Sequence, residues 1–287
     1  MKDYKTTEEL IEVMQNKGIN VKDFDYAKEK IEKYGFYNIV NTYREPFRKN
    51  GSYLPNVSFN ELCALFEFDL NIKSLLLKYI LEVEIIIKNR LADCIGSNYG
   101  IEAYLNIDNF NINNTNDNLI IELINRINDE ISHSSIKHDA VSHYINNYGY
   151  VPPYVLVKIL SIGTLSKYYQ LMKQADQQTI SKYFKITDKD LKSLLKNLTF
   201  LRNICAHSDR LYCYRNIITL GKQLLPANYN FRKNINDLYT VILALEKVLP
   251  KTSYENLINE FNNELKILES QLKSISIDKI KGIIGIR

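Results

Sequence analysis

The stretch from Ser58 to Ile95 contains neither glycine nor proline, and this feature constrains the fold more than any other. Ser58 and Glu61 have the spacing of a capping box, so we expect a helix to begin there, and Gly96 is expected to end it. Apolar residues recur in this stretch at steps of three and four, a pattern that buries one stripe of a helix. We therefore expect one long helix or two nearly collinear ones, covered by at least two partner helices.

The rest of the chain also favours helices, because only ten glycines and six prolines interrupt 287 residues. The fold class is thus predicted to be all-α, without strands. Further helices are expected at about 7–17, 23–34, from 39, 119–132, 154–162, 165–172, from 188, 235–249 and 254–274. We expect a polar link around His133, His138 and His143, an Asn-rich surface excursion at 106–118, and a loose or partner-binding tail at 275–287.

Composition restricts the class of protein. Lys and Arg exceed Asp and Glu by 37 to 33, which permits binding to a polyanion without requiring it. The cysteines form no CxxC pair and the four histidines show no zinc-ligand spacing, so we expect no metal and no cofactor. No apolar signal core follows Met1, and no apolar run approaches the ~18 residues of a membrane span, so we expect a cytoplasmic protein without membrane contact.

The run from Arg202 to His207 is the candidate catalytic segment. Thr187 and Asp190 have capping-box spacing, and the helix that they open leads into this run. Histidine has an ordinary pKa near ~6.5, so His207 can accept or donate a proton at neutral pH. Arg202 can hold two phosphate oxygens at once and stays charged. Asn203 is a third candidate, as an amide that orients His207.

Spacing alone is weak support for this site. Positions five apart on a helix point about 140° away from each other, so Arg202 and His207 do not share a face. Either the helix ends near His207, or Arg202 curls round to the site, or two chains combine their copies of the motif. Asn203, His207, Arg210 and Tyr214 would share a face if the helix continued. A loose Arg-to-His spacing also occurs at Arg126 and His133, where nothing else looks like a site.

Three segments together resemble the Abi-like abortive-infection family (AbiD/AbiF type) of the HEPN superfamily. Residues 201–214, LRNICAHSDRLYCY, resemble its RNxxAHxxRL signature. Residues 151–172, VPPYVLVKILSIGTLSKYYQLM, are similar to its segment with two prolines followed by FGTLS, although Ile162 replaces the usual Phe. Residues 66–91 resemble its long helix. The three segments occur in the family's order.

The resemblance implies a HEPN-type helical bundle with additional N- and C-terminal helices. We expect an N-terminal extension at 1–57, the HEPN-like core at 58–250, and a C-terminal helix and tail at 251–287. It also implies a homodimer that brings two motifs to one cleft, and assigns catalysis to Arg202, Asn203 and His207. Glu84 takes the place of the family's helix glutamate, Lys88 stands where the family often has Arg, and Tyr212 replaces a frequent Trp.

The function expected from this resemblance is a metal-independent endoribonuclease acting as an abortive-infection toxin against phage. Its partners would be RNA and a second copy of the chain, with Arg210, Tyr214 and Lys88 as candidate RNA contacts. We expect several other basic residues to form a track for the RNA backbone, without individual roles, namely Arg44, Arg48, Lys49, Lys182, Lys185, Lys189, Lys192 and Lys196. The alternatives are a non-catalytic protein that holds or is regulated by a small structured RNA, and a structural partner of another defence protein.

Overall fold

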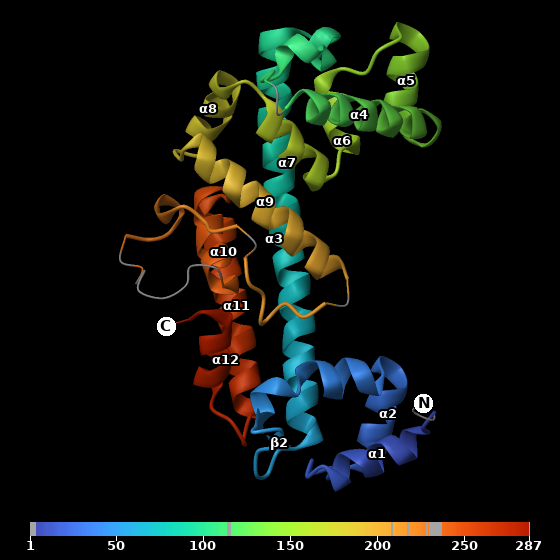
Figure 1. The fold of residues 1–287 in the computed structure, drawn as a ribbon, viewed down its shortest axis with the longest axis vertical. Helices are drawn as coiled ribbons and strands as arrows, with labels where there is room; N and C mark the ends of the chain where they lie inside the picture. The colour runs from blue at the N-terminus through green and yellow to red at the C-terminus, as the bar shows by residue number, and fades with distance from the viewer. Residues whose placement is uncertain are drawn as a thin grey trace.

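The computed structural model describes residues 4–113, 116–207, 209–216, 218–227, 229 and 237–286. Its axis is the helix α3 (Phe59–Tyr99), which spans about 60 Å and against which most other helices pack (Figure 1). The predicted cap is present, since the Ser58 hydroxyl accepts from the Glu61 amide and the Glu61 carboxylate accepts from the Ser58 amide. The predicted all-α class is confirmed.

Gly96 does not end α3, and this prediction was wrong. The helix continues to Tyr99, and Gly100 ends it with a φ of +73°. A glycine inside a helix costs only about 1 kcal/mol. The buried neighbours Ala92 and Ile95 hold this turn against the core, and their burial outweighs that cost.

The N-terminal part packs against the start of α3. It contains α1 (Thr7–Asn16), α2 (Phe24–Tyr34), a π turn (Tyr37–Asn41), a 3₁₀ turn (Glu45–Phe47), β1 (Arg48–Lys49) and β2 (Ser52–Tyr53). The two short antiparallel strands correct the expectation of no strand. Asn50 and Gly51 both have positive φ, which is the geometry of a tight two-residue hairpin turn.

The middle of the chain forms the upper part of Figure 1. It contains α4 (Asp117–Lys137), α5 (Asp139–Tyr148), α6 (Pro153–Ile159), α7 (Ile162–Leu171), α8 (Gln174–Tyr183) and α9 (Asp188–Ala206), with 3₁₀ turns at Ala103–Leu105 and Ile107–Asn109.

Two expectations for this part were wrong. His133 lies inside α4 and His143 inside α5, so the expected polar link is helical and only His138 separates the two helices. The break between α6 and α7 falls at Leu160 rather than at Gly163, because the Ser161 hydroxyl caps α7 by accepting from the Thr164 amide.

The Asn-rich excursion is anchored at its start. Phe110 is buried, and the amide of Asn111 donates to the carbonyl of Leu171. Positions 114–115 of the excursion lie outside the described residues. The described part is therefore a surface segment that one aromatic side chain fixes to the core.

The C-terminal part lies along the lower half of α3 in Figure 1. It contains α10 (Leu238–Ala244), α11 (Lys251–Gln271) and α12 (Ile277–Ile284), with 3₁₀ turns at Lys222–Leu224 and Leu245–Lys247. The first two positions of the expected helix at 235–249 lie outside the described residues. The observed helix α10 ends at Ala244, earlier than expected, and a 3₁₀ turn follows it. The expected loose tail is helical up to Ile284, and Ile277, Ile280 and Ile284 are buried; Arg287 lies outside the described residues.

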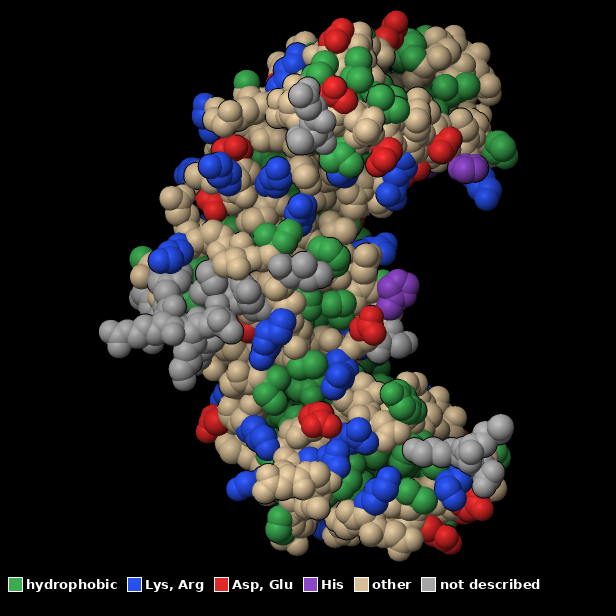
Figure 2. Space-filling model, in the orientation of Figure 1, with side chains coloured by type: hydrophobic (Ala, Val, Ile, Leu, Met, Phe, Trp, Pro, Cys, Tyr) green, Lys and Arg blue, Asp and Glu red, His purple; other side chains and the backbone are tan. Residues whose placement is uncertain are grey.

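One long core runs the length of α3 and joins these parts. Within the described part of the chain, every helix is too short or too polar to cross a bilayer. The molecule is indented on the side on which α9 ends, between α4 and α5 above and α1 and α2 below (Figures 1 and 2). We call this indentation the notch.

Candidate functional site

The helix α9 carries the candidate motif to the notch. Its cap is the predicted one, since the Thr187 hydroxyl accepts from the Asp190 amide at 3.1 Å. Its buried stripe packs on α3, α7 and α8 and consists of Leu191, Leu194, Leu195, Leu198 and Leu201. The helix ends at Ala206, and His207 leaves it in an extended conformation (φ −119°, ψ 177°). Of the three geometries left open by the sequence, the one in which the helix ends near His207 is therefore present.

The three candidate catalytic side chains have no polar partner among the residues that the structure describes. Arg202 is half-buried, while Asn203 and His207 are exposed. None of their side chains makes a hydrogen bond or ion pair with a residue that the structure describes. His207 is thus an exposed side chain at the end of α9, and no described residue occupies the hydrogen-bonding groups of the three side chains.

Arg210 and Tyr214 do not share the face of Asn203 and His207, because the helix has already ended. The Arg210 guanidinium is exposed and donates to the carbonyl of Thr42 at 3.1 Å. Tyr214 is buried, and burial raises the pKa of its hydroxyl to about 12. The expectation that Tyr214 lines a path for RNA is therefore corrected, since its ring belongs to the core.

Asp69 is a residue that the sequence analysis missed. Its carboxylate is fully buried on α3 and accepts from the backbone amides of Leu211 and Tyr212, just after the motif. It also accepts from the Tyr43 hydroxyl at 2.7 Å and pairs with the Lys73 ammonium at 3.1 Å. Asp69 thus holds the segment that follows His207, and is a positioning residue.

A signal for Asp69 was present in the sequence. The apolar stripe of α3 runs through Leu62, Leu65, Ile72 and Leu76, and Asp69 stands at the step between Leu65 and Ile72 where the spacing calls for an apolar residue. A lone acid inside a buried stripe must find hydrogen-bond donors. Its partners come from a distant segment, so they could not be named.

The end of α9 lies beside this Asp69–Lys73 pair. Burial raises the pKa of the Cys205 thiol to about 12, an effect that the nearby Lys73 partly opposes. Cys205 is therefore a protonated packing residue and not a nucleophile.

Lys88 is bound to the protein at some distance from the motif. Its ammonium pairs with the Glu84 carboxylate at 2.7 Å, and both side chains are largely buried. Lys73 lies beside Cys205, and Lys88 is about 22 Å further along α3. The structure brings Arg202, Asn203, His207 and Arg210 to one end of α9, and leaves Lys88 and Glu84 elsewhere in the same chain.

The Arg126–His133 spacing forms no comparable arrangement. Arg126 pairs with Glu130 at 3.2 Å, one turn along α4, and His133 is exposed. Over the ranges that the structure describes, no three His, Cys, Asp or Glu side chains come together as metal ligands.

Comparison with known proteins identifies a family. Residues 29–213 match the sequence model of a family described as Abi-like protein. This range is more than half of the chain and takes in α3, α9 and the motif. No curated protein and no solved structure matches the chain.

Proposed function

The chain belongs to the Abi-like protein family, and from this premise we propose that it is a metal-independent HEPN-type endoribonuclease of abortive infection, a defence against phage. The observation that carries the proposal is the arrangement at the end of α9. There, a histidine, an arginine and an asparagine that match the family signature have no partner among the described residues, at the end of the helix that reaches the notch.

The chemistry needs three groups. A base takes the proton of the 2′-hydroxyl, whose oxygen then attacks the adjacent phosphorus. The bond from phosphorus to the 5′-oxygen breaks, an acid protonates that oxygen, and the products are a 2′,3′-cyclic phosphate and a 5′-hydroxyl. Histidine serves as base or acid near neutral pH, and arginine stabilises the charge that grows on the phosphate. We assign these roles to His207 and Arg202, with Asn203 orienting the substrate or the ring.

Two chains would supply one complete site. One histidine cannot at the same moment accept the first proton and donate the second, so two copies of His207 at one cleft provide both groups. A second copy placed in the notch by a two-fold axis would set its motif opposite the first.

A cleavage assay tests the proposal. A labelled single-stranded RNA is incubated with the full chain in EDTA, and the ends of the products are identified. We expect cleavage to a cyclic phosphate, and a loss of rate of about 10²- to 10⁴-fold in His207→Ala. The matched control is His133→Ala, an exposed histidine on α4, which should keep the full rate.

Mixing the variants tests the shared site. After subunit exchange in an equal mixture of wild type and His207→Ala, a site built by two chains should keep about one quarter of the activity, and a site within one chain about one half. Cleavage that is equal in the wild type and in His207→Ala would refute the catalytic role. RNA binding without cleavage by the wild type would instead favour the non-catalytic RNA-binding alternative.

A further inference from the structure

A hollow of about 380 Å³ lies between α7 and α9, beside the motif. Gly163, Ser166 and Lys167 of α7 line it on one side, and Lys196, Thr199 and Phe200 of α9 on the other. The two helices lie close together at its base, since a Cβ on Gly163 would stand 3.5 Å from the methyl group of Thr199. The ring of Phe200 is 39% exposed, so an apolar face is open to a ligand. We call this hollow the α7–α9 pocket.

The side chains that line the α7–α9 pocket include two lysines and no carboxylate. From Leu191 to His207 the chain contains no Asp or Glu, and neither does α7. Lys167, Lys192 and Lys196 form no ion pair within the part of the chain that the structure describes. Burial lowers the pKa of Lys192, and so do the nearby Lys196 and Lys167, with only Asp188 opposing. Figure 2 shows Lys and Arg side chains along the course of α9 on this face.

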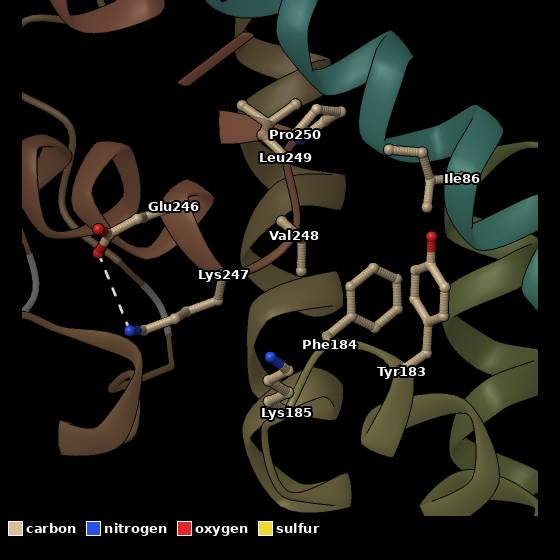
Figure 3. Close-up of a pocket in the computed structure, with 9 residues that line it drawn as sticks. All are labelled: Ile86, Tyr183, Phe184, Lys185, Glu246, Lys247, Val248, Leu249 and Pro250. Atoms are coloured by element: carbon tan, nitrogen blue, oxygen red, sulfur yellow. Dashed lines mark ion pairs between the residues drawn. The ribbon is translucent and has the colours of Figure 1, made fainter. Parts of the chain in front are cut away.

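A second hollow, of about 540 Å³, differs from the α7–α9 pocket in the charges that line it (Figure 3). It lies between α3, α8 and the turn before α11, and it also combines aromatic rings with lysines, Tyr183 and Phe184 with Lys185 and Lys247. Its wall, however, includes the Glu246 carboxylate, 3.9 Å from the Lys247 ammonium. It therefore has an anion of its own, which the α7–α9 pocket lacks.

The α7–α9 pocket and part of the motif lie along α9. Phe200 and Asn203 are three positions apart and share one face of this helix. Asn203 lies about 4.5 Å and Ala206, the last helical residue before His207, about 9 Å further along the helix axis than Phe200. A polymer that passes the motif would therefore also pass the pocket.

We propose that the α7–α9 pocket binds one unpaired nucleotide of a single-stranded RNA, with its base against Phe200 and its phosphate between Lys167 and Lys196. An exposed aromatic ring stacks only on a base whose face is free, which excludes a base within a duplex. The pocket thereby sets the position of the strand relative to His207. This inference rests on the proposed function, because it takes RNA as the ligand.

Binding measurements with an RNA that cannot be cleaved test this role. A fluorescent 2′-O-methyl RNA of twelve nucleotides is titrated with the full chain, and its anisotropy is followed at several salt concentrations. Phe200→Ala should weaken binding by about fivefold or more, as expected for loss of one stacked base, and Phe200→Tyr should restore it. The control is Phe24→Ala on α2, a phenylalanine of similar exposure (45%).

The two lysines are tested through the salt dependence. The double variant with Lys167→Gln and Lys196→Gln should show a weaker salt dependence of RNA binding. The slope of log affinity against log salt concentration should decrease in magnitude by about 1.4, that is about 0.7 for each lost phosphate contact. Lys251→Gln, an exposed lysine on α11, should leave the slope unchanged. The duplex of the same sequence should bind more weakly than the single strand.

The outcomes separate this inference from the proposed function. If the wild type cleaves RNA but Phe200→Ala binds like Phe24→Ala, the pocket inference fails and the nuclease stands. If the strand binds through Phe200 and the lysines but nothing is cleaved, the nuclease fails and the pocket stands. Binding of free AMP without binding of the strand would overturn the pocket inference, and so would preference for the duplex.

Discussion

The buried carboxylate of Asp69 accepts a 2.6 Å hydrogen bond from the backbone amide of Tyr212, 143 residues later in the chain. Through this bond the middle of α3 holds the segment that follows His207. The same carboxylate is paired with Lys73, whose side chain is itself almost completely buried. The end of the motif is therefore positioned by a charge in the core of the protein.

Substitution of Asp69 should strongly destabilise the protein. Asp69→Asn leaves the Lys73 ammonium buried without its counter-charge, which typically costs 3–5 kcal/mol, so we expect the free energy of unfolding to fall by about 3 kcal/mol. Urea denaturation measures this loss. Asp129→Asn, at an exposed position of α4, is the control and should change stability by less than about 0.5 kcal/mol. Similar losses in both variants would contradict the role of Asp69.

Replacement of each of two glycines by alanine should change the stability of the protein in opposite directions. A Cβ on Gly221 would stand 1.8 Å from Oδ1 of Asp190, the residue that the α9 cap places against Thr187. Gly221→Ala must displace that carboxylate, so it should destabilise the protein by about 2 kcal/mol. At Gly96, inside α3, a Cβ meets nothing within 4 Å, so Gly96→Ala should stabilise by about 0.5–1 kcal/mol. Thermal unfolding of the two variants gives the signs, and a gain in stability from Gly221→Ala would contradict the destabilising role of this close approach.

Glu61 should make stability depend on pH in the acid range. Burial alone would raise the pKa of this carboxyl, but hydrogen bonds from Ser274 and Lys273 lower it below its ordinary 4.5. The unfolded chain therefore binds a proton at Glu61 more readily than the folded protein does. The stabilisation is complete above about pH 4.5 and is lost as the pH falls through the lower pKa of the folded state.

Glu61→Gln isolates this contribution. It should lower the free energy of unfolding by about 2 kcal/mol at pH 7, as expected for lost hydrogen bonds to a charged group. The difference from the wild type should shrink as the pH falls below about 4.5, where Glu61 is itself protonated. Glu12→Gln on the exposed side of α1 serves as control. A difference that is constant from pH 7 to pH 3 would exclude the linkage.

The thiols should be unreactive in the folded protein. Burial raises the pKa of Cys63 and Cys205 to about 12 and that of Cys94 to about 11, and it also raises the pKa of Cys213. At pH 8 the thiolate that reacts with disulfide reagents is then almost absent. Ellman's reagent should label the native protein slowly and all four cysteines at once in guanidinium. Rapid labelling of native Cys205 would contradict its assignment as a packing residue.

Much of the helical framework could be predicted from local patterns. The starts of α3 and α9 follow from Ser58 with Glu61 and from Thr187 with Asp190, because a cap is formed by atoms within four residues of each other. The motif at the end of α9 could also be identified, since its residues are consecutive and resemble a family signature. Whether they cleave RNA is a prediction that the assays above decide.

The sequence by itself determined the all-α class, the caps and the position of the motif on its helix, because each depends on short-range spacing. Only the tertiary structure decided that Gly96 stays helical, that Tyr214 is buried, that the tail docks as α12, and that Asp69 receives its donors from residues 211 and 212. Each of these depends on surface buried between segments far apart in the chain. Local spacing cannot identify such partners, since they are set by the burial of apolar surface and of polar groups between distant segments.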